Sequence, residues 1–297
     1  MYKQIDANKR RTFYMFFIFL LLVIGIGWLL SYAFDAQIIL WVAVSIAVIQ
    51  GWVSYSYSDK IALAVTGAKP ADEGRYRELH RIVENLATTG GLPKPRVYVI
   101  DDPAPNAFAT GRDSKTAAVA VTTGLIETLE RSELEGVIAH ELAHIGNRDI
   151  LVMTVAVTLV GAIVLVSDLM LRNWFWGGSR SRNGNQGGGY IILIALILAI
   201  LAPLFAQLIS LAVSRKREYL ADATGALLTR YPEGLALALK KIAHYNQPMK
   251  RANRATAHLF IDEPFGREEG HGQSWFTTIF STHPPITDRV KKLMEMS

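Results

Sequence analysis

The chain has 297 residues, of which 51% are hydrophobic, and a formal net charge of only +5. This hydrophobic fraction is high for a water-soluble domain. The small net charge, and the lack of a basic stripe interleaved with aromatic residues, argue against a nucleic-acid partner. Cysteine is absent, which excludes disulfides and thiolate metal sites, so any metal must be held by His, Asp or Glu.

Four apolar segments approach or reach the roughly 20 residues that a membrane-spanning helix needs. They are residues 13–34, 36–54, 150–171 and 190–213. The first is interpreted as a retained anchor and not a signal peptide, because no small-x-small cleavage site stands out and a second span follows at once. We therefore expect four transmembrane or membrane-associated helices in contact with the lipid bilayer.

Basic residues near the span ends predict the orientation. Lys3, Lys9, Arg10 and Arg11 precede the first span. The N-terminus is therefore expected in the cytoplasm, with a tight turn at Asp35 outside and a return near Ser56. Three arginines in the connection 172–189 argue mildly against placing that loop outside. The sequence favours a multi-pass protein of the cell (inner or plasma) membrane whose soluble part faces the cytoplasm.

The apolar segments divide the chain into four parts. Residues 1–55 form a membrane anchor of two helices, and residues 150–213 form a membrane hairpin with a flexible Gly- and Asn-rich loop at 172–189. Residues 56–149 and 214–297 are polar enough to be soluble. Together these two parts are long enough for one domain with its own core.

The soluble parts predict an α+β fold that is mainly α, with a small β-sheet. Helices are predicted at 73–89, ended by Gly90 and Gly91, and at 232–245. Strands are predicted at 95–100 and 116–122, with a possible third at 106–111. A capping box at Ser132 and Glu135 predicts a helix that runs through His144. Residues 246–274 are predicted to form a long loop.

The pattern His-Glu-x-x-His at 140–144 indicates metal chemistry. On a helix, His140 and His144 lie four residues apart and share a face, so their imidazoles can bind one zinc ion. Glu141 is rotated about 100° from His140, which places its carboxylate beside the metal, where it can take a proton from the attacking water. A helix face with two surface histidines is the structural alternative.

A catalytic zinc site needs a third protein ligand. Asn147 and Ile150 stand where the metzincin pattern requires glycine and histidine, so that class is excluded. The other histidines are His80, His244, His258, His271 and His283. Glu218 is the better candidate because it follows the fourth apolar segment directly, as His144 precedes the third. Asp222, one turn on, could accept a hydrogen bond from a ligand histidine. Alternatively, both acids balance Arg215 and Arg217 on a solvated helix.

Four separated motifs resemble the membrane zinc metalloproteases of the HtpX type, relatives of the CAAX prenyl protease. In chain order they are NAFATG, HELAHIGNRD, RKREYLADATGA and STHPPITDRV. The resemblance implies a gluzincin-like site with one zinc ion per chain, His140, His144 and Glu218 as ligands and Glu141 as the catalytic carboxylate. It also implies degradation of misfolded or damaged membrane proteins in protein quality control.

Two further features gain weight from the resemblance. The strand that contains Asn106, Ala107, Phe108 and Ala109 could pair with an extended polypeptide substrate, although an ordinary sheet edge explains it equally well. His283 is a candidate catalytic donor to the negatively charged transition state, and Arg289 could support it. A lone histidine is more often structural.

The motif is flanked by Arg131, Glu133, Glu135, Arg148 and Asp149. So many charges are costly within lipid, so we expect the site at the membrane surface, and intramembrane cleavage of the site-2 type is the weaker alternative. A zinc-bound scaffold without activity is a second alternative, but the intact Glu141 argues against it. The pattern does not predict an oligomeric state.

Overall fold

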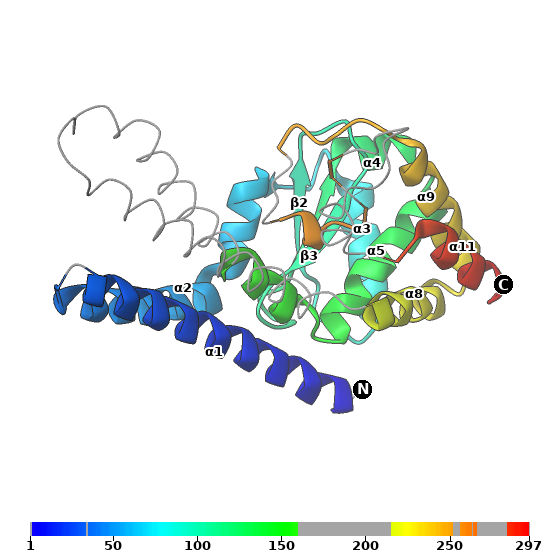
Figure 1. Cartoon of the computed structure of the whole chain (residues 1–297). Coiled ribbons are helices and arrows are strands. Elements are labelled where there is room, and N and C mark those ends of the chain that lie inside the picture. The colour runs from blue at the N-terminus through cyan, green and yellow to red at the C-terminus, as the bar shows by residue number, and fades with distance from the viewer. Residues whose placement is uncertain are drawn as a thin grey trace.

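The computed structural model describes residues 2–33, 35–159, 215–251, 256–262, 264–265 and 284–296. Figure 1 shows two long helices that extend away from a domain in which helices surround a small sheet. This arrangement confirms the predicted α+β, mainly helical fold. The predicted span 190–213, the loop 172–189, residues 160–171 of the third predicted span and about half of the predicted loop 246–274 lie outside the described residues.

The two long helices are α1 (Tyr2–Ala33) and α2 (Ile38–Thr66). They pack side by side (Figure 1), and each contains a stretch long and apolar enough to cross a membrane, Arg10–Tyr32 and Ile38–Thr66. Helix α2 continues beyond the predicted end at residue 54, because the chain has no glycine or proline until the left-handed Gly67 (φ 72°). Ala62 and Leu63 in its last turns pack against residues of the sheet.

The sheet has four strands in the order β1-β2-β4-β3. These are β1 (Lys69–Pro70), β2 (Arg96–Ile100), β3 (Ala107–Thr110) and β4 (Ala118–Thr122). Strands β2 and β4 are parallel, and the other two pairs are antiparallel. The three predicted strands are confirmed. Strand β1 was not predicted, because it has only two residues and one of them is proline.

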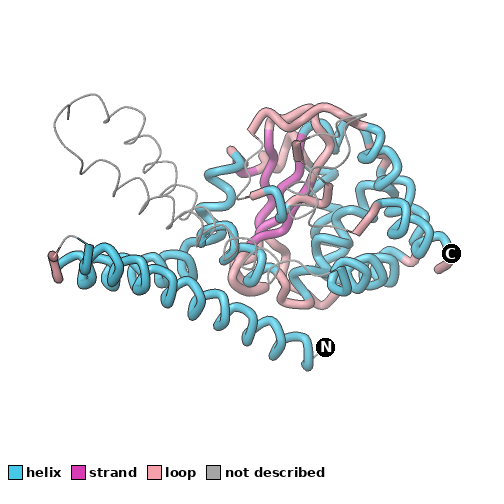
Figure 2. Tube along the Cα trace, in the orientation of Figure 1, coloured by secondary structure: helices cyan, strands magenta, loops and turns pink. Residues whose placement is uncertain are grey.

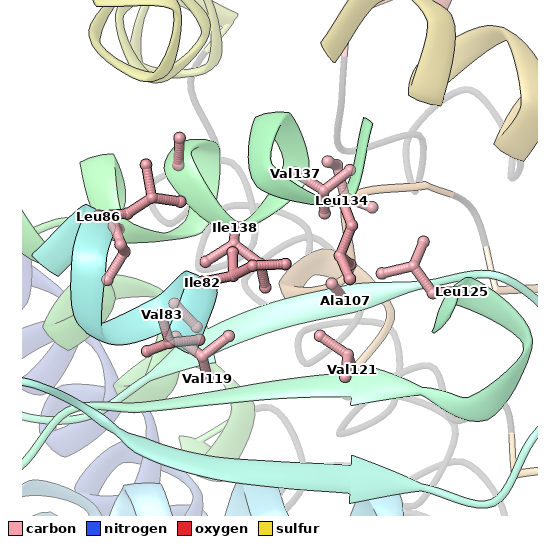
Figure 3. Close-up of a cluster of buried hydrophobic side chains, with 14 of the residues drawn as sticks. Ile82, Val83, Leu86, Ala107, Val119, Val121, Leu125, Leu134, Val137 and Ile138 are labelled. Carbon is pink, nitrogen blue, oxygen red and sulfur yellow. The ribbon is translucent and has the colours of Figure 1, made fainter. Parts of the chain in front are cut away.

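The two faces of the sheet contact different helices, because side chains alternate between the faces of a strand. Val97, Val119 and Val121 pack against α3 (Arg77–Thr89) and α5 (Arg131–Gly146), which cover one face (Figure 3). Phe108 and Ala120 point to the opposite face. They pack there against the end of α2, the helical segment Ile150–Leu159 and the 3-10 helix η1 (Ala257–Leu259). The sheet thus separates α5 from the membrane-proximal helices.

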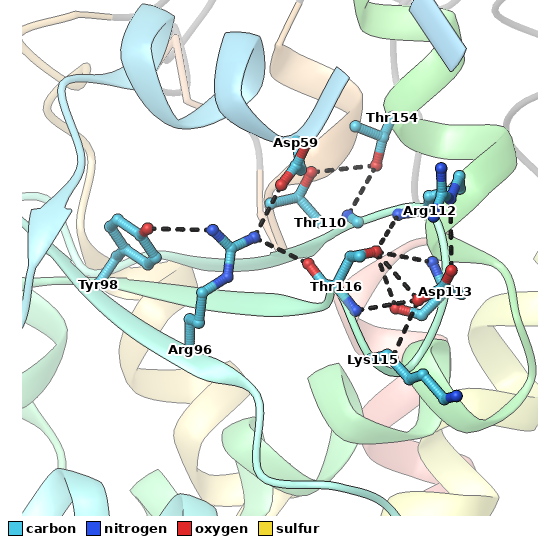
Figure 4. Close-up of polar contacts among 10 residues, drawn as sticks. Asp59, Arg96, Tyr98, Thr110, Arg112, Asp113, Lys115, Thr116 and Thr154 are labelled. Carbon is cyan, nitrogen blue, oxygen red and sulfur yellow. Dashed lines mark hydrogen bonds and ion pairs between the residues drawn. The ribbon is translucent and has the colours of Figure 1, made fainter. Parts of the chain in front are cut away.

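Polar contacts fix the membrane-proximal helices to the sheet (Figure 4). Arg96 of β2 lies 2.7 Å from the Asp59 carboxylate of α2 and donates to the carbonyl of Thr116. At the edge strand β3, the hydroxyls of Thr110 and Thr154 are 3.1 Å apart. The sheet is therefore attached both to the second span and to the helical segment that follows α5.

Helix α5 begins earlier than predicted. The predicted cap at Ser132 is wrong: Glu130 is the N-cap, and it exchanges hydrogen bonds with Glu133 in a capping box. Glutamate is an unusual N-cap residue, but Glu133 is buried and also accepts a 2.7 Å bond from Lys241. The contact between Lys241 and Glu133 therefore favours a helix that begins after Glu130. The short helix α4 (Thr123–Thr128) leads into α5 from β4.

Three helices lie on the side of α5 away from the sheet (Figure 2). Helices α8 (Arg215–Thr229) and α9 (Pro232–His244) pack on α5, and α11 (Ile286–Met294) packs on α8 and α9. Helix α9 confirms the helix predicted at 232–245, and α3 confirms the one predicted at 73–89 with a start four residues later. Glycines allow α9 to approach closely, because a Cβ at Gly136 would lie 2.6 Å from the Leu235 nitrogen.

We predict that Gly136→Ala lowers the free energy of unfolding by about 1–3 kcal/mol, because the added methyl must displace the α9 backbone. Gly146→Ala is the matched control on the same helix, since its nearest neighbour would be the Leu92 side chain at 3.8 Å. The control should be neutral or slightly stabilising. Thermal melting of the detergent-solubilised variants measures both. A Gly136→Ala melting temperature at or above that of the wild type would contradict this packing.

Candidate metal centre

The two histidines of the His-Glu-x-x-His motif converge on one point. Helix α5 carries both, so the four-residue spacing places His140 and His144 on one face, and both are buried. Their Nε2 atoms are 3.2 Å apart. The alternative of two surface histidines is therefore wrong, and both imidazoles present a nitrogen to the same small volume.

Glu218 completes this group from α8. Its Oε2 lies 3.7 Å from the Nε2 of His140, and its Oε1 lies 3.6 Å from the Nε2 of His144. One ligand atom from each of the three residues falls within 4.8 Å of the others. Glu218 and Asp222 are only 4% and 2% exposed, which excludes the solvated helix face considered above.

The spacing on α8 explains how Glu218 reaches the histidines. Glu218, Asp222 and Gly225 follow at intervals of four and three residues and so share one face. A Cβ at Gly225 would lie 3.0 Å from the backbone nitrogen of His140. The missing side chain lets α8 approach the α5 backbone closely, which brings both carboxylates against the imidazoles.

The rival histidines among the described residues lie elsewhere. The Nε2 atoms of His80 and His258 are 3.1 and 3.0 Å from the carbonyls of Ala71 and Met153, and His244 is exposed at the end of α9. His271 and the candidate catalytic His283 lie outside the described residues.

Asp222 and Arg289 orient His140. The Nδ1 of His140 lies 2.9 Å from Asp222 Oδ1, so this nitrogen donates and Nε2 is left to accept or bind. Arg289 of α11 donates to both oxygens of Asp222 at 2.7 and 3.0 Å, and its side chain is fully buried. This bidentate pair satisfies the buried carboxylate and fixes its direction.

Asp149 orients His144 in the same way and was not predicted. Its Oδ2 lies 3.3 Å from the Nδ1 of His144. Helix α5 ends in a Schellman motif, in which the N–H groups of Arg148 and Asp149 donate to the carbonyls of Ile145 and His144. This turn returns Asp149 to His144. The left-handed position of this motif is usually a glycine, but here it is Arg148 (φ 57°). The turn could therefore not be predicted from a glycine in the sequence.

The electrostatics of the two histidines differ. Burial and the nearby charge of Arg289 lower the pKa of His140 to about 4 despite the bond to Asp222. Burial also disfavours a charged His144, but the hydrogen bond to Asp149 and the charge of Glu218 outweigh it and raise the pKa of His144 to about 9. Burial would raise the pKa of Asp222, yet Arg289 lowers it to about 2.

Glu141 lies next to the group and outside it. It follows His140 on α5, is buried, and does not belong to the three residues whose ligand atoms converge. Its charge contributes to the raised pKa of both His144 and Arg289. General-base chemistry at a metal site requires a carboxylate that is beside a ligand and outside the ligand set.

The candidate substrate strand is at the edge of the sheet, because among the described residues β3 pairs with no strand except β4. Part of its free side is already occupied. The N–H of Ile261 donates to the carbonyl of Ala107 at 3.0 Å, and the Asn106 side chain bonds the backbone of Asp262. The side chains of Phe108 and Ala109 are buried.

The donor set itself fits a divalent metal. Two imidazoles, each with Nδ1 bound to a carboxylate, and one glutamate are a ligand set of catalytic zinc sites. All three donors are buried and come from two helices that pack tightly against each other. These three residues could therefore hold a divalent metal ion.

Comparison with known proteins identifies the family. Residues 73–297 match the model of peptidase family M48. The chain is 47% identical to a "Protease HtpX homolog" of Caldanaerobacter subterraneus and 48% identical to one of Thermoanaerobacter pseudethanolicus, over all of this chain and 98% of each relative. The crystal structure of S. mikatae Ste24p shares the fold, with a TM-score of 0.50 and 20% identity over 99% of this chain and 67% of that one. The chain belongs to peptidase family M48 and is a membrane-bound metalloprotease.

Proposed function

We propose that the chain is a zinc endopeptidase that holds one zinc ion per chain through His140, His144 and Glu218. The observation that carries this proposal is the convergence of three buried ligand atoms within 4.8 Å, beside a glutamate that is not a ligand. A zinc ion bound there would polarise the scissile carbonyl and acidify a water molecule.

The protein groups perform the proton transfers and the positioning. Glu141 accepts the proton of the attacking water and passes it to the leaving amine nitrogen. Asp222 and Asp149 accept the Nδ1–H groups of His140 and His144, which keeps each Nε2 lone pair directed at the metal position. Arg289 holds Asp222 in place.

We propose that substrate lies as an extended segment along β3, next to the Asn106, Ala107, Phe108 and Ala109 backbone. Because Ile261 and Asp262 already bond to Asn106 and Ala107, the remaining edge is nearest Ala109. His283 stays a predicted donor to the transition state on the sequence pattern alone. The substrates that suit a membrane-anchored domain are misfolded or damaged membrane proteins, and we propose the cytoplasmic face of the cell membrane as the location.

We predict that Glu141→Gln lowers the hydrolysis of an unfolded casein-type substrate by about 10³-fold or more while the protein keeps its zinc, since the amide cannot accept the proton. Metal analysis and a protease assay on the same detergent-purified sample measure both. Glu135→Gln on the same helix is the matched control and should retain activity. Retained activity in Glu141→Gln, or loss of its zinc, would exclude this role.

We predict that Glu218→Ala weakens zinc binding sharply, by about 100-fold or more, because only two of three protein ligands remain. Competition with a chromogenic chelator measures the dissociation constant. His244→Ala, which changes an exposed histidine, should bind zinc like the wild type. An unchanged dissociation constant in Glu218→Ala would show that another residue is the third ligand.

The proposed orientation is tested by single cysteines, because the natural chain has none. We predict that an impermeant thiol reagent labels Asp35→Cys in intact cells but labels Glu127→Cys only after lysis. Both positions are exposed in the structure, so a difference reports the side of the membrane. Labelling of Glu127→Cys in intact cells would reverse the proposed topology.

A further inference from the structure

The first turns of the membrane anchor lie against the protease domain. Figure 1 shows that the N-terminal end of α1 lies beneath the domain and near α8. Asn8, two residues before the apolar stretch Arg10–Tyr32 begins, is only 4% exposed. A polar side chain that is this buried needs hydrogen-bond partners, and they indicate what it does.

Three acceptors at the end of α5 surround the side-chain nitrogen of Asn8. Its Nδ2 lies 2.7 Å from Asp149 Oδ1 and 3.4 Å from the carbonyls of Asn147 and Arg148. Because all three neighbours accept hydrogen bonds, the amide nitrogen and not its oxygen must face them. Asn8 therefore binds the turn in which Arg148 is left-handed and from which Asp149 reaches His144.

Asp149 depends on this contact. The carboxylate is 1% exposed, and a buried carboxylate is costly unless donors satisfy both oxygens. The Oδ2 of Asp149 faces the Nδ1 of His144. Its Oδ1 lies 2.7 Å from the Nδ2 of Asn8 and 3.8 Å from the guanidinium of Arg217. The short bond from Asn8 thus sets the rotation of the carboxylate, and that rotation decides whether Oδ2 points at His144.

We propose that Asn8 of the membrane anchor is a positioning residue of the metal centre, acting through Asp149 on His144. The inference rests on the proposed metal site and adds that this site is complete only when α1 is docked against the domain. Metal affinity in the full-length protein then depends on the anchor as well as on α5 and α8.

The first test is Asn8→Leu, which removes the donor at nearly constant volume. We expect the zinc dissociation constant, measured by chelator competition on full-length protein in detergent, to rise about 10- to 100-fold. Gln50→Leu is the matched control, because Gln50 on α2 bonds the carbonyl of Thr158 and makes no contact with Asp149. It should bind zinc like the wild type.

The second test is a double-mutant cycle. In Asp149→Ala alone, the Nδ1 of His144 loses its acceptor, so zinc binding should weaken. Because Asn8 acts through Asp149, adding Asn8→Leu to Asp149→Ala should change the dissociation constant by less than about threefold, although Asn8→Leu alone weakens binding strongly.

The melting temperature of the metal-free variants separates positioning from folding. If Asn8→Leu melts lower but binds zinc within twofold of the wild type, Asn8 is only structural and the inference is wrong. An effect of Asn8→Leu that is as large in the Asp149→Ala background as in the wild type also overturns it. Failure of the proposed function is distinct: His144→Ala would then bind zinc as tightly as the wild type.

Discussion

The convergence of His140, His144 and Glu218 depends on how closely α8 approaches α5. Gly225 removes the side chain at the crossing, so the α8 backbone rests on the backbone of His140. Only at this separation can a glutamate and an aspartate one turn apart both reach imidazoles on the neighbouring helix. A bulkier residue would push α8 outward and lengthen every ligand distance together, because interiors are close-packed and cannot absorb the extra volume. Gly136 has the same effect on the side of α5 that faces α9.

The charges around this crossing are balanced for a divalent cation. Among the described residues, four buried carboxylates gather there, those of Glu141, Asp149, Glu218 and Asp222, with the two buried guanidinium groups of Arg217 and Arg289. Neutral histidines leave two negative charges in excess. The pKa values of the two histidines reflect this excess. Burial and the charge of Arg289, which pairs with Asp222, lower the pKa of His140 to about 4, so this ring is neutral. The negative charges of Asp149, Glu218 and Glu141 raise the pKa of His144 to about 9. A buried charge excess is unfavourable unless a cation offsets it.

The sequence predicted the parts of the site that depend on helical spacing. His140, Glu141 and His144 share one turn of a helix, and Glu218 with Asp222 share another, so periodicity placed each set. It did not predict Asp149 or Asn8, because their positions follow from tertiary contacts: a left-handed turn at an arginine, and a helix 140 residues away in the chain. The cap at Glu130 was missed for the same reason, since its partner Glu133 is supported by Lys241 of a distant helix.

The fold also explains why a hydrolytic site stands at the foot of a membrane helix. Charged groups end at Asp149, where the chain bends by 85° into the apolar segment Ile150–Leu159. That segment packs against Met15, Phe19 and Leu22 of α1. These residues follow Asn8 at intervals of seven, four and three, so one face of α1 binds both the apolar segment and the turn beside His144. A shift of α1 along its axis would break both contacts, so the packing of this helix and the position of the turn beside His144 depend on each other.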